Sequence, residues 1–260
     1  MFSKIFYINL DRRPDRKQNI IDELSQIKYT GPIERITAVD GRGFTKENMP
    51  KNLFTPEAIN NAFDKTKGLY YVMTKGAAGC AMSHHNIYQK IIKESNNTEK
   101  TLILEDDVKI TDNFIPKLNG YLRTIPDYDI LFLGYHLQTT KSPEIFNPVE
   151  KIWGLFGYII NKKAAIQILS IFPLKYQIDS EMPKIFKNLK VFSLREDLRL
   201  ITSDESQNTQ SQFGSDAQIR EGFINLSEIS NKINMPNLSE MNNKINIILI
   251  IILAFLYYIN

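Results

Sequence analysis

Residues 4–16 decide the fold class, and they read Lys4-Ile-Phe-Tyr-Ile-Asn-Leu-Asp-Arg-Arg-Pro-Asp-Arg16. The first seven of these residues are mostly apolar, which is typical of a buried strand. Pro14 suits the first position of a helix, because its fixed φ matches the helix and its missing N–H would have no partner there. Asp15 is favourable at the positive end of the helix dipole. The stretch therefore predicts a strand that leads directly into a helix.

The residues after Arg16 continue this pattern. Apolar residues recur at helical spacing, at Ile20, Ile21, Leu24 and Ile27. Residues 34–39 then have the pattern of a second strand, which ends before Asp40-Gly41. A strand, a helix and a strand in this order predict a sheet with parallel strands.

Further strands and helices alternate down the chain. We expect strands at 101–104, 130–133, 152–160 and 190–194, and helices at 80–93, 114–123, 162–171 and 181–187. Residues 43–75 are polar and rich in loop-forming residues, so we expect a loop there. Together these segments predict one α/β domain over residues 1–222 with a mostly parallel central sheet.

The composition of the 260 residues excludes several classes of protein. Hydrophobic residues make up 43% and charged residues 23%, which excludes wholesale disorder. The 32 basic and 29 acidic residues nearly balance, so we expect no nucleic-acid partner. The single cysteine, Cys80, cannot form an internal disulfide, and we expect it to be a small buried residue at a helix start.

Three carboxylates, Glu105-Asp106-Asp107, follow the short apolar strand predicted at 101–104. They would lie at the carboxyl edge of the sheet, where open α/β sheets bind ligands. Because side chains alternate along a strand, Glu105 and Asp107 would share one side and Asp106 would face away. Two carboxylates on one side suit a hard divalent cation such as Mn²⁺ or Mg²⁺. On these residues alone, a solvated acidic turn explains the motif equally well.

Other polar motifs accompany the acidic one. Arg12, Arg13 and Arg16 gather where the N-terminus of a helix would meet an anionic ligand. Further along, Thr74-Lys75-Gly76 and residues 79–84 lead into a predicted helix. Taken singly, each of these motifs also fits an ordinary charged or turn-forming surface segment.

The order and spacing of these motifs resemble glycosyltransferase family 25, which contains the lipooligosaccharide galactosyltransferases and the procollagen galactosyltransferases. The resemblance covers most of residues 4–220. It is carried by residues 7–16, 38–42, 74–76, 79–80, 83–84, 104–108, 131–134, Trp153, 157–158, 178–179 and 188–193.

This resemblance implies a GT-A-like, Rossmann-type nucleotide-sugar-binding fold. It also implies inverting transfer of a sugar, most often galactose, from a UDP-sugar with Mn²⁺ (or Mg²⁺) as cofactor. Glu105 and Asp107 would hold the metal. The residues that would contact the donor are Asn9, Arg13, Arg16, Asp40, His84 and Asp106. The acceptor would be a glycan or a collagen-like protein.

An inverting transfer also needs a carboxylate that takes the proton of the acceptor hydroxyl as it attacks. Asp179 matches an aspartate of the family and is our candidate for this base. Its alternative role is the N-cap of a short helix, a position that aspartate favours. His84 has an alternative role as well, that of a core histidine whose hydrogen bonds are satisfied.

The chain departs from the family pattern in two places. Ala78 stands where the family usually has an acidic residue, and residues 194–198 replace a segment that usually contains proline. The third metal ligand is therefore open, with Asp204 and Asp216 as candidates. These departures favour an alternative function, that of a catalytically silent, membrane-anchored binding or scaffolding protein with the same fold.

The end of the chain has a different character. Residues 225–234 nearly repeat as 237–246, with eight of ten positions identical, and we interpret 223–244 as a polar linker. Residues 245–259 carry no charge and would span about 22 Å as a helix, against about 30 Å of bilayer hydrocarbon. We expect 245–260 to anchor the chain in a membrane rather than to form a buried terminal helix. Because no signal peptide precedes the first strand, we expect the catalytic domain on the cytosolic side.

Overall fold

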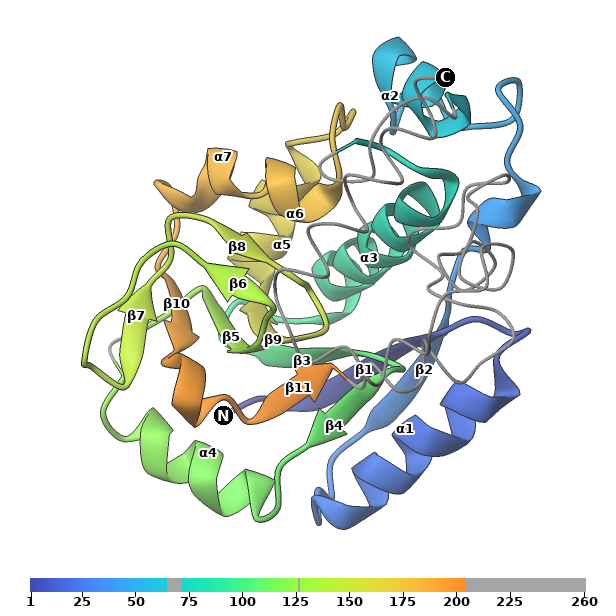
Figure 1. Ribbon diagram of the computed structural model, residues 1–260. Helices are drawn as coiled ribbons and strands as arrows, with labels where there is room; N and C mark the ends of the chain where they lie inside the picture. The colour runs from blue at the N-terminus through green and yellow to red at the C-terminus, as the bar shows by residue number, and fades with distance from the viewer. Residues whose placement is uncertain (65–71, 126, 204–260) are drawn as a thin grey trace, which may run out of the picture. The chain divides into compact units, whose positions relative to one another are not determined.

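The structure is a computed structural model of the chain, and it describes residues 1–64, 72–125 and 127–203. Its central sheet contains β1 (Lys4–Asn9), β2 (Ile33–Thr37), β3 (Lys100–Glu105), β5 (Ile130–Gly134), β7 (Phe146–Pro148), β9 (Gly157–Asn161) and β10 (Val191–Leu194). The strand order is β2-β1-β3-β9-β5-β10-β7 (Figure 1). Strands β2, β1, β3, β5 and β10 run in one direction, and β9 and β7 run against them. The predicted α/β fold with a mostly parallel central sheet is confirmed.

Helices cover both faces of this sheet. Helices α1 (Pro14–Gln26) and α4 (Phe114–Leu122) lie on one face, and α3 (Lys75–Glu94) and α5 (Lys162–Leu169) lie on the other (Figure 1). The side chains of β1 alternate between two apolar cores: Ile5 packs with residues of α1 and α4, whereas Phe6 packs with residues of α3 and α5. A strand buried on both faces needs a continuous apolar run, which is why the first strand was readable from the sequence.

Short elements complete the described part of the chain. They are η1 (Gly41–Gly43), α2 (Pro56–Phe63), α6 (Ile178–Glu181), α7 (Pro183–Phe186) and η2 (Glu196–Leu198), with the strand pairs β4 (Val108–Ile110) with β11 (Ile201–Ser203) and β6 (Leu137–Gln138) with β8 (Ile152–Trp153). In the first pair, Ser203 lies opposite Val108, the residue that follows the acidic motif. The end of the described chain thus returns to the edge of the sheet where the acidic motif lies.

The loop predicted at 43–75 is wrong in part, because it contains helix α2. Thr55 caps this helix, since its Oγ1 accepts a hydrogen bond from the N–H of Ala58 (3.2 Å), and Pro56 occupies the first helical turn. The helix buries Ala58, Ile59 and Ala62. Its apolar stripe is too short to be recognised within a polar segment. The Thr55-Pro56 pair, a cap residue followed by a proline, was the sequence signal that could have indicated the start of this helix.

The single strand predicted at 152–160 is also wrong. The structure divides it into β8, which pairs with β6, and β9, which belongs to the central sheet. The break lies at Gly154, whose φ of +95° is accessible to glycine at little cost. A Cβ atom at this position would lie 2.8 Å from Cδ2 of His136, so glycine is needed there for space as well.

Helix α3 begins at Lys75, earlier than the predicted start at 80. Thr74 caps it, because Oγ1 of Thr74 accepts a hydrogen bond from the N–H of Ala77 (3.0 Å). Gly76 and Gly79 have low helix propensity, which hid the first turns of this helix in the sequence.

The predicted linker at 223–244 and membrane anchor at 245–260 lie outside the described residues, as do Asp204 and Asp216. Within the described part of the chain, no helix combines the length and the apolar character needed to cross a bilayer.

Candidate active site

The neighbouring parallel strands β2, β1 and β3 end at one edge of the sheet and bring separate motifs together there. Asn9 ends β1, Glu105 ends β3, and β2 leads to Asp40. The chain leaves β1 through α1 toward β2, whereas β3 lies on the other side of β1. Such a reversal of strand order opens a crevice between the strand ends, which is where α/β sheets bind ligands. A cleft of about 120 Å³ lies at this place.

Most of the residues that line this cleft have polar or charged side chains. They are Asn9, Arg12, Arg16, Asp40, Arg42, Lys75, Cys80, Ser83, Glu105, Asp106 and Asp107. Six of the eight residues predicted for the donor and the metal are in this set: Asn9, Arg16, Asp40, Glu105, Asp106 and Asp107. The structure therefore brings together motifs that are up to about 100 residues apart in the sequence.

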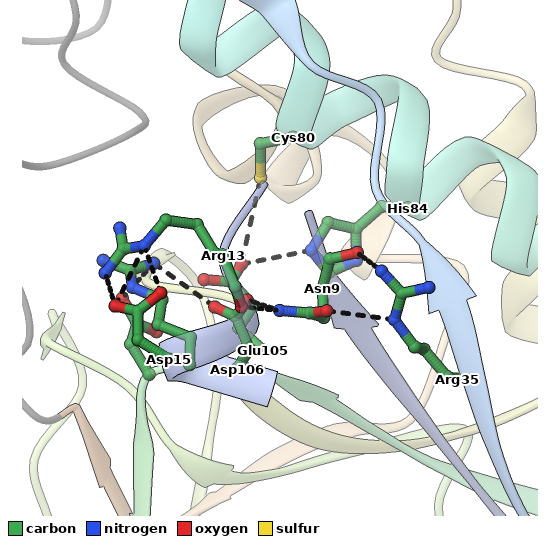
Figure 2. A network of polar contacts seen from close by, with 10 residues as sticks. Asn9, Arg13, Asp15, Arg35, Cys80, His84, Glu105 and Asp106 are labelled. Carbon is green, nitrogen blue, oxygen red and sulfur yellow. Dashed lines mark hydrogen bonds and ion pairs between the residues drawn. The ribbon is translucent and has the colours of Figure 1, made fainter. Parts of the chain in front are cut away.

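Asn9 is buried and fixes the position of Asp106. Its Nδ2 donates a hydrogen bond of 2.6 Å to Oδ2 of Asp106 and another of 3.1 Å to the carbonyl oxygen of Arg13. Its Oδ1 accepts a hydrogen bond from Nε of Arg35 (2.9 Å), as Figure 2 shows. Because Arg35 occupies the oxygen of the amide, the nitrogen must face Asp106. Arg35 on β2 thereby orients Asn9, a role that the sequence did not reveal.

The expectation that Asp106 faces away from its neighbours is wrong. Nη1 of Arg16 lies 3.2 Å from Oδ1 of Asp106 and 3.3 Å from Oδ2 of Asp107, so both carboxylates meet one guanidinium group. The alternation of side chains ends at Glu105, where β3 ends and the chain enters a turn. Asp106 and Asp107 belong to this turn and not to the strand.

The acidic motif has more negative charge than its protein partners offset. Burial and the nearby Glu105 carboxylate together raise the pKa of Asp107 to about 7, and Arg16 only partly opposes them. Burial also raises the pKa of Asp106, although Arg16 and Asn9 act in the opposite direction. A divalent cation would offset this charge and favour ionised carboxylates. The oxygen-rich group therefore fits a hard cation of the Mn²⁺ or Mg²⁺ type.

Glu105 is held from above by helix α3 (Figure 2). Its Oε1 lies 3.3 Å from Nε2 of His84 and 3.8 Å from Sγ of Cys80. Burial on its own would raise the pKa of Glu105, but the hydrogen bond from His84 and the charge of Arg16 lower it. The donor atoms of these three residues lie within 4.8 Å of one another and could themselves hold a metal ion.

His84 is fully buried, so it acts on the cleft through Glu105. Its Nδ1 lies 2.8 Å from the hydroxyl oxygen of Tyr158, which in turn lies 2.7 Å from the hydroxyl oxygen of Tyr88. The alternative of a core histidine with satisfied hydrogen bonds describes this geometry. A direct contact of His84 with the donor stays a prediction.

The basic side of the cleft is organised by Asp40. This carboxylate accepts hydrogen bonds from Nε of Arg12 (2.9 Å) and from Nη2 of Arg42 (2.7 Å). Burial raises the pKa of Asp40, but the hydrogen bonds from Arg42 and the charge of Arg12 outweigh it and lower the pKa to about 2. Asp40 therefore stays ionised and holds two arginines beside the cleft.

Arg13 does not reach the surface of the cleft. Its side chain is fully buried and forms a two-pronged ion pair with Asp15, with Nε 3.0 Å from Oδ1 and Nη2 2.7 Å from Oδ2. Its predicted contact with the donor stays a prediction.

Two glycines let the segment after β2 pack on the first turns of α3. A Cβ atom at Gly41 would overlap the carbonyl oxygen of Lys75, and one at Gly79 would overlap that of Val39. Ser83 locks this contact, because its Oγ accepts from the N–H of Val39 (2.8 Å) and donates to the carbonyl of Gly79 (2.7 Å). The spacing of the Asp-Gly and Gly-Cys motifs thus reflects close backbone packing at the cleft.

Asp179 lies in the first turn of α6, whose N-cap is Gln177, so the N-cap alternative for Asp179 is wrong. Oδ2 of Asp179 accepts a hydrogen bond from the N–H of Gly154 (3.3 Å). Burial raises the pKa of Asp179, the hydrogen bonds from Gly154 and Ser180 oppose this, and the charge of Glu105 adds to the rise. Asp179 is thus within electrostatic reach of the acidic motif.

The comparison with protein families agrees with this geometry. A family model described as glycosyltransferase family 25 (LPS biosynthesis protein) matches residues 2–144. The chain belongs to glycosyltransferase family 25. The matched segment of this family 25 chain contains the whole cleft, from Ile8 to Asp107, whereas Asp179 lies beyond it.

Individual relatives carry the names of glycosyltransferases. A candidate glycosyltransferase of Acanthamoeba polyphaga mimivirus is 31% identical over 177 residues, which cover 62% of this chain and 51% of that protein. Procollagen galactosyltransferase 2 of Homo sapiens is 26% identical over 210 residues, which cover 75% of this chain and 32% of that protein. Inactive glycosyltransferase 25 family member 3 of Homo sapiens is also 26% identical, over 200 residues that cover 71% and 32%. The chain thus spans about half or less of the length of these relatives.

Among solved structures, the glycosyltransferase GlyE of Streptococcus pneumoniae is similar to this family 25 chain with a TM-score of 0.45 and 12% identity. The match covers 92% of this chain and 66% of that one.

Proposed function

We propose that this family 25 chain is a metal-dependent inverting glycosyltransferase. It would move a sugar, with galactose as the first candidate, from a UDP-sugar to a hydroxyl group of a glycan or a collagen-like protein. The observation that carries the proposal is the cleft between the ends of β1, β2 and β3, which has an acidic wall and a basic wall.

The basic wall supports binding of a diphosphate. Arg12, Arg42 and Lys75 line the cleft together with the first turn of α3. The N-terminus of a helix carries partial positive charge and unpaired N–H groups, which bind phosphate oxygens. The side chain of Lys75 also donates to the carbonyl oxygen of Arg42 (3.2 Å), so the two basic segments are held together.

The acidic wall supports binding of Mn²⁺ (or Mg²⁺) by Glu105 and Asp107. A cation there would neutralise the charge that develops on the departing UDP. His84 orients the Glu105 carboxylate from behind, and Arg16 orients Asp107 from the side. Asn9 and Arg16 both contact the Asp106 carboxylate, so a positioning role for Asp106 beside the metal ligands is part of the proposal.

Asp179 is the candidate for the general base. Its partial burial raises its pKa, so its carboxylate is a stronger proton acceptor than an exposed one. In the transfer, the acceptor oxygen forms a bond to the anomeric carbon while the bond from that carbon to the UDP oxygen breaks. The electron pair leaves on UDP, and the hydroxyl proton moves to Asp179.

A panel of UDP-sugars with Mn²⁺, offered together with glycan and collagen-like acceptors and scored by product mass, tests this proposal. Asp107→Ala should lower donor hydrolysis and transfer together by about a hundredfold or more, because it removes a proposed metal ligand. Asp112→Ala is the matched control, since Asp112 is exposed and follows the same strand region. Full activity of Asp107→Ala in the presence of a chelator would contradict the metal assignment.

The second candidate function is a catalytically silent binding or scaffolding protein. The observation that favours it is that the chain is as similar to a relative named inactive as to a named galactosyltransferase, with 26% identity in both cases. Thermal stabilisation by UDP with Mn²⁺ separates the candidates. No shift with any UDP-sugar would favour the silent protein.

The membrane anchor at 245–260 and the cytosolic placement of the catalytic domain remain part of the proposal. Recovery of the full-length protein in the soluble fraction after carbonate extraction would remove the anchor from it.

A further inference from the structure

A second cavity, of about 220 Å³, lies beyond the carboxyl end of β5. Its walls come from residues 135–138, from the segment that leads into β7, and from the residues that follow β10. Strand β5 runs in the same direction as β1 and β3, so this cavity opens at the same edge of the sheet as the candidate active site. None of the motifs that define the cleft contributes to it.

The floor of this cavity is made of buried polar side chains. Oε1 of Gln138 accepts a hydrogen bond from Oγ of Ser193 (2.9 Å), and Nε2 of Gln138 donates to the hydroxyl of Tyr135 (3.3 Å). The hydroxyl of Tyr135 donates to the carbonyl oxygen of Leu194 (2.8 Å). These bonds fix the amide of Gln138, and its Nε2 carries a second hydrogen beyond the one given to Tyr135. The floor can therefore donate a hydrogen bond to a ligand from a fixed position.

The rim of the cavity has balanced charge. Lys141 forms an ion pair with Glu196 (3.5 Å), and Arg195 forms one with Asp197 (2.6 Å). Leu137 adds an apolar surface that is 55% exposed. Paired charges, a fixed amide and an apolar side chain suit a neutral molecule with hydroxyl groups better than an anion.

The segment 153–156 connects this cavity with the candidate base and the acidic motif. His136, which lines the cavity, donates its backbone N–H to the carbonyl of Trp153 (2.8 Å), and its ring packs edge-on against Phe156. The next residue, Gly154, donates its N–H to Asp179, and the carbonyl of Phe156 accepts from the N–H of Glu105 (3.0 Å). The cavity, Asp179 and Glu105 are thus all attached to one four-residue segment.

We propose that this second cavity binds the acceptor, a neutral hydroxyl-rich molecule whose reacting hydroxyl lies toward Asp179. The inference rests on the proposed function, because we assign the cavity to the acceptor from its position relative to the proposed general base and the proposed donor site. Gln138 and the charged rim would bind hydroxyl groups of the acceptor, and Leu137 would contact its apolar face.

Two substitutions in the full-length protein test this proposal. Ser142→Trp fills the cavity from its half-buried wall and should raise the KM for the acceptor by about tenfold or more. Leu137→Ala removes exposed apolar surface and should raise it by about threefold. Both variants should keep the KM of the wild type for the UDP-sugar. The matched controls are Ser170→Trp and Ile166→Ala, two exposed positions on or next to α5, and they should change neither constant.

Binding measured without turnover separates this inference from the proposed function. The probes are a procollagen-derived peptide and a neutral oligosaccharide, titrated by calorimetry in the presence of UDP and Mn²⁺. Weaker binding of a probe to Ser142→Trp than to Ser170→Trp supports the acceptor cavity even if the chain turns over no donor. Equal binding to the two variants, a parallel loss of UDP affinity in Ser142→Trp, or no binding of either probe to the wild type would overturn it.

Discussion

The cleft and the second cavity lie at one edge of the same sheet but are built in different ways. The cleft is charged, and Arg16, Asp106 and Asp107 have little exposure to solvent there. The rim of the second cavity holds its charges in exposed pairs such as Lys141 with Glu196. Buried charges require complete sets of partners, whereas exposed pairs contribute little to stability. We therefore expect substitutions of charged residues to lower the free energy of unfolding far less at the cavity than at the cleft.

Replacing one arginine in each region gives the largest expected contrast. Arg16→Leu leaves two buried carboxylates without their guanidinium partner and should lower the free energy of unfolding by about 3 kcal/mol at neutral pH. Arg195→Leu, at the rim of the cavity, should change it little, because the Arg195–Asp197 pair is exposed. Urea denaturation of both variants measures the difference. Equal losses in the two variants would break the contrast between the regions.

The loss in Arg16→Leu should also depend on pH. The pKa of Asp107 is about 7 in the folded chain, above its ordinary value of 3.8, so ionisation of this group disfavours the folded state. Removing the arginine raises that pKa further. The part of the deficit that Asp107 causes should therefore be small below about pH 6, grow as the pH rises through 7, and level off only above the raised pKa of the variant. A deficit that is constant from pH 4 to pH 8 would mean that the carboxylates are not its cause.

Glycine packing at the cleft gives the next contrast. Gly41→Ala places a Cβ atom on the backbone of Lys75. It should therefore lower the free energy of unfolding by about 2 kcal/mol and weaken the binding of UDP. Gly43→Ala, in the same turn of 3₁₀ helix, meets nothing within 4 Å and is the control. Thermal unfolding and UDP titration compare the two variants. If Gly41→Ala keeps the stability of Gly43→Ala, the segment after β2 adapts more easily than its packing on α3 predicts.

Two buried tyrosines give the smallest effect. Tyr158→Phe removes the hydroxyl that holds His84 and should cost about 1 kcal/mol of stability, with weaker Mn²⁺ binding. The hydroxyl of Tyr128 is buried without a hydrogen-bond partner in the described part of the chain, so Tyr128→Phe should be neutral or slightly stabilising. Chemical denaturation with and without Mn²⁺ measures both. Equal stability and equal Mn²⁺ binding in Tyr158→Phe and Tyr128→Phe would mean that the network behind Glu105 adds nothing to the cleft.

The sequence predicted those parts of the fold that depend on local pattern. The strand at Lys4–Asn9, the helix that Pro14 opens and the strand after it were readable, because each carries its own apolar periodicity. The break at Gly154 was not readable, because a single glycine within an apolar run does not reveal its φ. Helix α2 was missed because its buried stripe is short.

The candidate site was predictable in its residues but not in its contacts. The carboxylates at 105–107 were found because charged residues directly after an apolar strand are unusual. The direction of the Asp106 side chain could not be predicted, because it depends on where β3 ends, and the strand ends at Glu105. The pairing of His84 with Tyr158 spans 74 residues, and no local pattern contains it. Similarly, Arg13 and Arg16 look equivalent in sequence, yet only Arg16 reaches the acidic turn.

The row of hydrogen bonds behind Glu105 has a direction. An ionised Glu105 accepts the proton on Nε2 of a neutral His84, so Nδ1 must accept from Tyr158, and Tyr158 must accept from Tyr88. Each proton in the row thus points toward the cleft when the carboxylate is charged. A protonated Glu105 would no longer require a donor at Nε2 of His84, so the donors and acceptors of these hydrogen bonds could exchange roles. The hydroxyl proton of Tyr88, deep in the core, is therefore a natural spectroscopic reporter of events at the cleft.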